Sequence, residues 1–384
     1  MEKIFFFLYS ILTLIIYILS IPFLLLFSFK DKYKLSIPSR FFRYKNSPLK
    51  KNGIWFHSCS FGEAKAIKVI TDELNSDDLR MTTTTNTGFE AIGQYTKESR
   101  FLPFEIMLFG WIRPQKTLVV MEAEFWYLLF YLAKRQGTRT ILINARMSDK
   151  SYPKYLKIRW FYREIFKYID EIYAQTNLDR DRLISLGAKN VVVTGNIKLA
   201  SIPISTKEFK KPSDLVVCGA STHEGEEELI LNAFDVFKKD NPQASLILVP
   251  RHPQRFDKIY NLIKSFDKYS HQRYSVNKDF KSDIILIDTL GELINIYAIS
   301  DIVILGGAFA PIGGHNASEI VPFDCKIISG KHYFNQRDIF SAIEGIAIVE
   351  DFNLSKRLLQ HHLLKPCRLK YKTDISPIID TLLK

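Results

Sequence analysis

Glycine and polar residues gather in one stretch of the chain, Asp301–Glu319, with the sequence DIVILGGAFAPIGGHNASE. The apolar run 302–305 is typical of a buried parallel strand and ends in the pair Gly306-Gly307. Glycines at a strand end let the backbone approach a ligand closely, and the helix predicted after His315 would present unpaired N–H groups. The spacing matches neither the dinucleotide nor the P-loop motif. The stretch therefore fits a phosphate or sugar site, and equally a tight turn before a capped helix.

A second candidate group follows the predicted strand 54–57, where Gly62 permits a turn and Glu63 begins a helix. A carboxylate there could act as a general base for a hydroxyl if apolar surroundings raise its pKa, or could simply complement the helix dipole. The next strand ends in the hydroxyls of Thr82–Thr85. These could bind a polyol or phosphate, or serve as an ordinary N-cap.

Charged residues also follow later strands of the first half. Glu122 and Glu124 come directly after the strand 117–121 and stand beside bulky apolar residues, so they are not typical surface acids. Arg146 follows the next strand and could hold a carboxylate or phosphate with two parallel hydrogen bonds. Lys198 closes the strand at the junction of the two halves.

The second half repeats the pattern at its own strand ends. The segments concerned are Ser221-Thr222-His223, Arg251-His252, Leu290-Gly291-Glu292 and the glycine-rich stretch. Together they predict one ligand held by backbone amides, arginine and a helix dipole, and a phosphorylated nucleotide fits. The histidines have no ligand-like pairing, and the four cysteines lie far apart without a C-x-x-C motif. We therefore expect no metal and no disulfide framework, and a reducing compartment.

These residues require alternating strands and helices to position them. The strands predicted are 54–57, 81–85, 117–121, 140–144, 171–175 and 191–194, then 215–219, 245–250, 284–288, 301–305 and 326–329. Helices are predicted at 63–74 and 126–135, and from near residues 224, 253, 292, 318 and 336. The alternation predicts an α/β fold of two doubly wound parallel sheets, with ligands beyond the carboxyl ends of the strands. The polar stretch 207–214 separates domains expected at 31–206 and 207–384.

The sequence of residues 1–30 predicts a membrane anchor. Ile4–Phe29 carries no charge, exceeds the roughly 20 residues that span a bilayer, and lacks the cleavage site of a signal peptide. Of the net charge of +12, residues 1–51 contribute nine basic against two acidic residues, as expected of a patch facing anionic lipid rather than nucleic acid. We expect an anchor in the inner membrane, either spanning or interfacial, with the body on the cytoplasmic side.

Ten motifs in order resemble those of the bacterial 3-deoxy-D-manno-octulosonic acid (Kdo) transferases, which are lipid A-specific. The motifs are HSCSFGE, TTTTNTG, MEAEFW, INARMSDKS, VTGNIK, GASTHEGEEE, VPRHPQRF, DTLGEL, GGHNASE and GKHYFNQRD. The resemblance implies a membrane-anchored glycosyltransferase with two Rossmann-like domains, the GT-B fold. It also implies transfer of Kdo from CMP-Kdo to a lipid A precursor, lipid IVA, in the inner-core biosynthesis of lipopolysaccharide.

The resemblance also implies roles for individual residues. Glu63 would be the catalytic base of an inverting displacement, and Glu122 and Lys198 would stabilise the transition state. The implied CMP-Kdo-binding residues are Arg251, His252, Leu290, Gly291, Glu292, Asn316, Ala317, Ser318 and Glu319. No metal, cofactor or covalent intermediate is implied. Tyr127, Ala200, Ala308 and Ala317-Ser318 depart from the usual family pattern, which bears on acceptor fit and CMP contacts.

We expect the lipid A precursor, inner-membrane lipid and CMP-Kdo as partners, with no nucleic acid and no obligatory protein partner. Two alternatives stay open at this point. One is another lipid-acceptor glycosyltransferase of the same fold that uses a different nucleotide sugar. The other is a catalytically inactive membrane-anchored binding protein.

Overall fold

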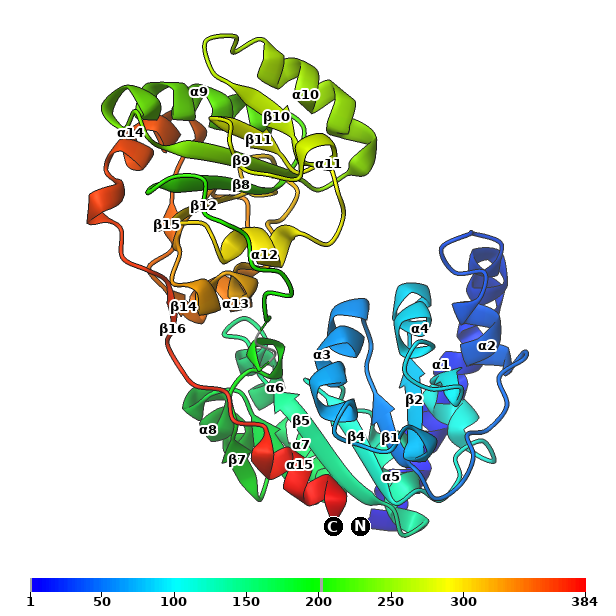
Figure 1. The fold of residues 1–384 in the computed structure, drawn as a ribbon. Coiled ribbons are helices and arrows are strands. Elements are labelled where there is room, and N and C mark those ends of the chain that lie inside the picture. Colours follow the sequence, from blue (N-terminus) through cyan, green and yellow to red (C-terminus); the bar gives the residue numbers. More distant parts are fainter. Residues whose placement is uncertain (1, 201–202) are drawn as a thin grey trace. The chain divides into compact units, whose positions relative to one another are not determined.

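The computed structural model describes residues 2–200 and 203–384, and its contacts divide the chain into two compact units. Unit 1 comprises Met1–Ser201 and Thr373–Lys384, and unit 2 comprises Ile202–Lys372. Each unit contains a seven-stranded parallel sheet with helices against it (Figure 1). The predicted α/β class with two doubly wound halves is therefore confirmed.

Unit 1 alternates strands and helices as its sequence pattern predicts. Its strands are β1 (Ile54–His57), β2 (Leu79–Thr83), β3 (Ser99–Phe101), β4 (Thr117–Met121), β5 (Arg139–Ala145), β6 (Glu171–Ala174) and β7 (Val191–Val193). Its helices are α1 (Glu2–Ser28), α2 (Ser36–Phe42), α3 (Phe61–Thr71), α4 (Asn86–Ile92), α5 (Tyr127–Arg135), α6 (Tyr152–Lys157), α7 (Arg159–Phe166), α8 (Asn177–Leu186) and α15 (Ser376–Leu383). Short 3-10 helices lie at η1 (Ser76–Asp78), η2 (Glu105–Leu108) and η3 (Ile197–Leu199).

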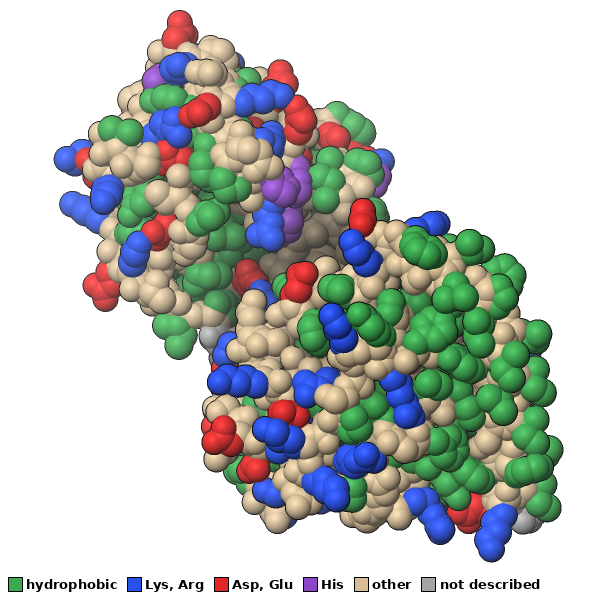
Figure 2. All heavy atoms as spheres, turned by 90° about the vertical axis from the view of Figure 1, so that its right-hand side faces the viewer, with side chains coloured by type: hydrophobic (Ala, Val, Ile, Leu, Met, Phe, Trp, Pro, Cys, Tyr) green, Lys and Arg blue, Asp and Glu red, His purple; other side chains and the backbone are tan. Residues whose placement is uncertain are grey.

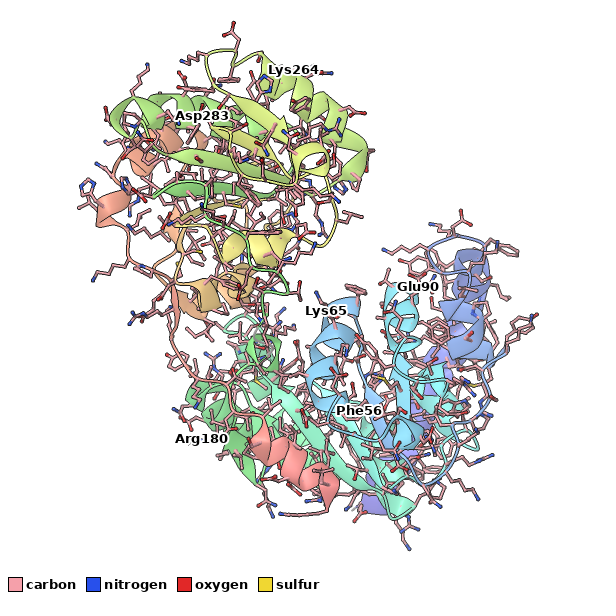
Figure 3. All side chains as sticks on the ribbon, in the orientation of Figure 1. Phe56, Lys65, Glu90, Arg180, Lys264 and Asp283 are labelled. Carbon is pink, nitrogen blue, oxygen red and sulfur yellow. The ribbon has the colours of Figure 1, made fainter. Side chains whose placement is uncertain are left out.

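Neighbouring residues of each strand in this unit face two different helix layers, because side chains alternate across a sheet. Trp55 of β1 packs with residues of α5, α7 and α8 in one core cluster. Phe56, the next residue, packs with α3, α4 and α15 in another. Figure 3 shows Phe56 in the sheet, whereas Lys65 of α3 and Glu90 of α4 are exposed. Both faces of the sheet are thus covered.

The C-terminal helix α15 belongs to unit 1, although the predicted second domain runs to residue 384. Ile378 and Leu382 are buried in the core cluster of the first sheet. Tyr173 Oη lies 2.7 Å from Thr381 Oγ1, and Arg139 donates to the carbonyl of Thr381 at 2.9 Å. Apolar burial and these two hydrogen bonds place α15 on the first sheet. The sequence does not reveal this contact, because α15 is far from the other residues of unit 1 along the chain.

Helix α1 is long and apolar enough to cross a membrane by its length and composition. Near its N-terminus Phe5 packs edge-on against Tyr127 with ring centroids 4.8 Å apart, and Tyr9 donates to Glu105 at 2.5 Å. Most of its other apolar side chains are exposed, and Figure 2 shows a broad hydrophobic face. The helix is thus a candidate anchor that also contacts the rest of unit 1.

Unit 2 repeats the alternation with shorter elements. Its strands are β8 (Val216–Thr222), β9 (Ser245–Pro250), β10 (His271–Arg273), β11 (Ile284–Leu286), β12 (Ile302–Leu305), β13 (Lys326–Ser329), β14 (Ile343–Glu344), β15 (Ala347–Ile348) and β16 (Arg368–Leu369). Its α-helices are α9 (Glu226–Asp240), α10 (Phe256–Lys264), α11 (Tyr274–Asn277), α12 (Leu293–Tyr297), α13 (Arg337–Ser341) and α14 (Leu354–Leu359). Its 3-10 helices are η4 (Pro253–Arg255), η5 (Ala317–Glu319), η6 (Val321–Phe323), η7 (Asp351–Asn353) and η8 (His361–Leu363).

Candidate functional site

In unit 1 the candidate catalytic residues lie where the direction of the strand order reverses. The order is β3-β2-β1-β4-β5-β6-β7, so β1 has β2 on one side and β4 on the other. Ligands of doubly wound sheets bind beyond the strand ends at this switch point. Glu63 stands in the first turn of the helix that follows β1, and Glu122 directly follows β4. The topology therefore brings two of the predicted catalytic residues to one place.

Glu63 is held by the turn that begins α3. Ser60 is the N-cap of this helix: its hydroxyl accepts from the Glu63 N–H and donates to Glu63 Oε1 at 2.8 Å. The N–H of Cys59 donates to Glu63 Oε2 at 2.8 Å. This is a variant of the capping box, in which the glutamate accepts the N–H of the residue before the N-cap rather than that of the N-cap itself. Both carboxylate oxygens are thus oriented by residues close in sequence.

The pKa of Glu63 is raised above its ordinary value. Burial is the main cause, and the nearby carboxylates of Glu122 and Glu124 add to it, while the hydrogen bonds from Cys59 and Ser60 oppose it. A raised pKa makes the ionised carboxylate a stronger base than an exposed glutamate.

Glu122 is the centre of an ion cluster. Lys198 Nζ lies 2.7 Å from its Oε1, and Arg146 Nε lies 3.2 Å from its Oε2. Asn144 accepts the N–H of Ile197 on its side-chain oxygen at 3.0 Å, which fixes the short helix η3 that carries Lys198. Glu122 and Arg146 follow β4 and β5, and Lys198 follows β7, so the folded sheet brings together three residues that are far apart in the sequence.

The threonine hydroxyls after β2 have a structural role. Thr84 and Thr85 donate to the carbonyl of Cys59 at 3.0 and 3.1 Å, and Thr85 caps α4 by accepting the N–H of Gly88. The N-cap interpretation therefore describes this segment, and its hydroxyls also hold the turn that orients Glu63.

Three side chains beside this turn could hold a metal ion. Donor atoms of His57, Cys59 and Glu124 all lie within 4.8 Å of one another. His57 and Cys59 come from the end of β1, and Glu124 comes from the segment after β4. Their positions in the sequence gave no metal-like spacing, because the three ligands meet only when the two strands pair.

Unit 2 has a switch point of its own. Its strand order is β10-β11-β9-β8-β12-β13-β15, so β8 lies between β9 and β12. The predicted segment Ser221–His223 lies at the end of β8, and Gly306-Gly307 directly follows β12. Parallel strands end at the same edge of a sheet, so both segments lie at the expected ligand position.

Glu226 organises this edge, although its position in the sequence does not mark it as a site residue. Its side chain is buried, and its two carboxylate oxygens accept backbone N–H groups at 2.8–3.3 Å. The four donors are His223, Gly307, Phe309 and Ala310. Glu226 begins a run of three glutamates in the first turn of α9. Such a run is typical of exposed residues that complement a helix dipole, so the sequence does not reveal that Glu226 is buried.

A cationic and imidazole cluster lies at the same edge. His223 Nε2 and His315 Nε2 are 2.8 Å apart, and the ring of His252 lies 5.2 Å from that of His223. Burial, with the nearby charges of His223, Arg251 and His252, lowers the pKa of His315 to about 4. Figure 2 shows histidine side chains gathered beside basic ones. The cluster supplies N–H donors suited to an anion.

The segment 290–292 is arranged differently from the histidine cluster. Glu292 is buried, pairs with Lys207, and accepts from Asn295 at 2.9 Å. Burial alone would raise the pKa of Glu292, but these two partners lower it. Leu290 is exposed, and Gly291 has a φ of 86° that favours glycine. The Glu292 carboxylate thus ties the segment around Lys207 to α12, while the Leu290-Gly291 turn stays accessible.

The α-helix predicted to start near Ser318 is wrong in type, because the structure has the 3-10 helices η5 and η6 there. Asn316 caps η5 through the Ser318 N–H at 3.1 Å and donates to Glu319 Oε1 at 3.2 Å. Pro322 has no N–H to extend a helical hydrogen-bond ladder. Helices of three residues have only a small dipole. An anion bound at this segment would therefore have to be held by side chains and by the backbone amides of the turn.

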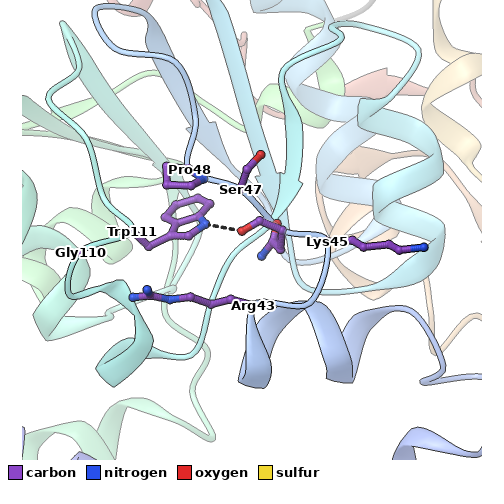
Figure 4. Close-up of a pocket in the computed structure, with 7 residues that line it drawn as sticks. Arg43, Lys45, Ser47, Pro48, Gly110 and Trp111 are labelled. Carbon is purple, nitrogen blue, oxygen red and sulfur yellow. Dashed lines mark hydrogen bonds between the residues drawn. The ribbon is translucent and has the colours of Figure 1, made fainter.

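A pocket of about 550 Å³ lies elsewhere in unit 1 and contains none of the predicted site residues (Figure 4). Trp111 donates from its indole to the carbonyl of Asn46 at 2.9 Å. The lining residues are Arg43, Lys45, Asn46, Ser47, Pro48, Gly110 and Trp111. The pocket joins the segment after α2 to the loop after η2.

Comparison with known proteins shows which protein family this chain is similar to. A family model described as 3-deoxy-D-manno-octulosonic-acid transferase (kdotransferase) matches residues 36–201. The 3-deoxy-D-manno-octulosonic acid transferase of Haemophilus influenzae is 32% identical over 381 residues, covering 92% of this chain and 88% of that protein. The transferase of the same name from Aquifex aeolicus is 29% identical over 325 residues, covering 81% and 85%.

Solved structures show the fold. The UDP-GlcNAc 2-epimerase of Neisseria meningitidis bound to UDP-GlcNAc has a TM-score of 0.50 at 13% identity, covering 82% of this chain and 90% of that one. This similarity shows the fold alone, and the fold is the predicted GT-B arrangement of two Rossmann-like domains. The C-terminal CMP-Kdo binding domain of WaaA from Acinetobacter baumannii is 26% identical and covers 44% of this chain and 85% of that one. The TM-score of this comparison is 0.35.

Proposed function

Because the chain belongs to the 3-deoxy-D-manno-octulosonic acid (Kdo) transferase family, we propose that it moves Kdo from CMP-Kdo to the lipid A precursor lipid IVA. Family membership makes the chain a glycosyltransferase that transfers Kdo in lipopolysaccharide biosynthesis. The observation that carries the finer proposal is Glu63, a carboxylate held by two hydrogen bonds at the switch point of unit 1, with a raised pKa.

Glu63 acts as the general base in this proposal. Its carboxylate takes the proton from the acceptor hydroxyl, and the hydroxyl oxygen attacks the anomeric carbon of Kdo on the face opposite CMP. The bond between that carbon and the phosphate oxygen breaks, CMP leaves with the electron pair, and the configuration inverts. The step balances without a metal, a cofactor or a covalent intermediate.

Lys198 and Glu122 act as a pair. The Glu122 carboxylate holds the ammonium group of Lys198 at 2.7 Å, so the positive charge is fixed before the reaction begins. A fixed charge stabilises negative charge that develops in the transition state without first having to reorganise. Arg146, the second cation on Glu122, strengthens the same field.

The donor is assigned to the switch point of unit 2. Arg251, His252 and His315 offer N–H groups to the single phosphate of CMP-Kdo, and the turn around Gly307 offers backbone approach. The segments Leu290–Glu292 and Asn316–Glu319 complete the proposed donor set.

The membrane location follows from the acceptor. Helix α1 is apolar, and the residues that follow it are rich in lysine and arginine, so the chain suits a surface of anionic lipid. We assign the anchor to the inner membrane, spanning or interfacial, with the enzyme body on the cytoplasmic side.

The test is incubation of the full-length enzyme in detergent with CMP-Kdo and lipid IVA, followed by mass spectrometry of the lipid. We expect a mass increase by one or more Kdo units together with CMP release. Turnover of a UDP-sugar without CMP release would instead identify a different glycosyltransferase of this fold. Absence of transfer by a folded protein with either donor would favour a binding protein.

A further inference from the structure

Three different metal-ligand side chains meet beside the turn that carries Glu63. The ring nitrogen of His57, the sulfur of Cys59 and a carboxylate oxygen of Glu124 all lie within 4.8 Å of one another. His57 is fully buried, while Cys59 and Glu124 are half-buried and can be reached from solvent. The set combines nitrogen, sulfur and oxygen donors on a rigid sheet edge.

The environment of His57 orients its ring for metal binding. Its Nδ1 faces the carbonyl of Thr82 at 3.2 Å and the hydroxyl of Thr82 at 3.0 Å, and that hydroxyl also accepts the indole N–H of Trp55. In the tautomer with the proton on Nδ1, this nitrogen donates to the Thr82 carbonyl and Nε2 presents its lone pair. Metal-bound histidines characteristically donate their second ring N–H to a backbone carbonyl in this way.

The spacing of the His57 and Cys59 donor atoms fits one tetrahedral ion. His57 Nε2 and Cys59 Sγ are 3.8 Å apart. Zinc bonds of about 2.0–2.1 Å to nitrogen and about 2.3 Å to sulfur, at a tetrahedral angle, place two such ligands about 3.6 Å apart. Glu124 lies beside the thiol of Cys59, and its Oε2 accepts from the indole of Trp126 at 2.7 Å. That indole fixes the carboxylate next to the sulfur.

We propose that His57, Cys59 and Glu124 form a binding site for a thiophilic divalent cation, with Zn²⁺ as the ion that best matches the donor set. On binding, the thiol releases its proton to solvent and the sulfur coordinates as thiolate. Thiolate and carboxylate together balance the two positive charges of the ion, and a fourth position stays open to water or a hydroxyl. The positive charge of Arg40 also interacts with Cys59 and Glu124.

The site has a structural consequence for the base proposed above. Cys59 donates its N–H to Glu63 Oε2, and its carbonyl accepts from Thr84 and Thr85. A cation bound through the Cys59 side chain would add a fixed point to the turn that orients Glu63. Because the ion binds only the folded chain, zinc should also raise the thermal midpoint of unfolding.

The test uses the full-length protein in detergent, stripped of metal with a chelator and titrated with Zn²⁺ against a chromophoric competitor. We expect one ion per chain and a higher midpoint of unfolding. Cys59→Ser and Glu124→Gln should each weaken binding by roughly 10-fold or more. The matched control Glu73→Gln changes an exposed glutamate of the same unit and should bind as the unaltered protein does.

Substitution by Co²⁺ tests the sulfur ligand without any variant. Thiolate-bound Co²⁺ shows a charge-transfer absorption in the near ultraviolet, and this band should appear with one equivalent of metal. Binding with no such band, or unchanged affinity in a folded Cys59→Ser protein, overturns the proposal. Both readouts are independent of Kdo transfer, so failure of the proposed function would leave this result intact.

Discussion

Lys198 Nζ lies 2.7 Å from Glu122 Oε1, although 76 residues of sequence separate them. Glu122 follows a strand next to the switch point, and Lys198 lies on η3, which Asn144 fixes. The pair therefore joins the centre of the sheet to the short helix η3, and it sets a defined charge beside the candidate base.

Replacing Lys198 by methionine should remove that charge while keeping most of the packing volume. We expect the rate of Kdo transfer to fall by about 10²-fold, the range for loss of one preorganised electrostatic group. Lys167→Met, which removes an exposed surface pair, is the control. Comparable rates for Lys198→Met and the unaltered enzyme would contradict a role for this charge.

Glu63→Gln should remove the base but keep the turn. The glutamine oxygen can still accept the N–H of Cys59, so the helix start should persist. We expect the rate to fall by about 10²–10⁴-fold in steady-state CMP release, with an unchanged circular dichroism spectrum. The unaltered enzyme should lose activity as pH falls through the raised pKa of Glu63, and this loss should disappear in the residual activity of the variant.

Glu226 should contribute stability to unit 2 as a positioning residue. In Glu226→Ala four backbone N–H groups lose their acceptor, which should cost about 3 kcal/mol or more of unfolding free energy in urea. Glu228→Ala, an exposed neighbour on the same helix, should change it little. Equal losses in the two variants would show that the carboxylate does not organise the glycine-rich turn.

His315 should make stability depend on pH. Its pKa is about 4 in the folded chain, against an ordinary 6.5, so between these values the unfolded chain binds the extra proton. Stability from this group is therefore present above pH 6.5 and declines as pH falls toward 4. Urea unfolding at pH 5 and pH 7 should show a smaller difference for His315→Gln than for the unaltered protein. A difference of the same size would count against a buried neutral imidazole.

Helix α15 should stabilise unit 1. Ile378 is fully buried against the first sheet, whereas Leu383, five residues further along the same helix, is 65% exposed. Ile378→Ala should lower the unfolding free energy by about 2–5 kcal/mol, and Leu383→Ala by much less. Chemical denaturation followed by tryptophan fluorescence reports this unit, which contains Trp55 and Trp111 in its core. If Ile378→Ala were as stable as Leu383→Ala, the packing of α15 on this unit would be in doubt.

Most strands, including the edge strand β7, could be predicted from sequence, whereas the short edge strands β3 and β10 could not. The bounds of β1, β4, β9 and β13 agree with the prediction, because runs buried on both faces are continuously apolar. The edge strands β3 and β10 were missed, since SRF and HQR carry polar residues that face solvent. The helix after His315 was wrong because local capping signals do not show whether a helix can continue.

For the site, the sequence by itself placed Glu63, Glu122 and Lys198, the proposed catalytic residues, each after a strand. The local turn at Ser60–Glu63 was also within its reach, since a capping box depends on neighbours alone. Tertiary structure decided the contact of Lys198 with Glu122, the buried role of Glu226, the meeting of His57 and Cys59 with Glu124, and the packing of α15 on unit 1. The physical reason is that each of these depends on which strands pair and which surfaces are buried, and those outcomes are properties of the whole sheet.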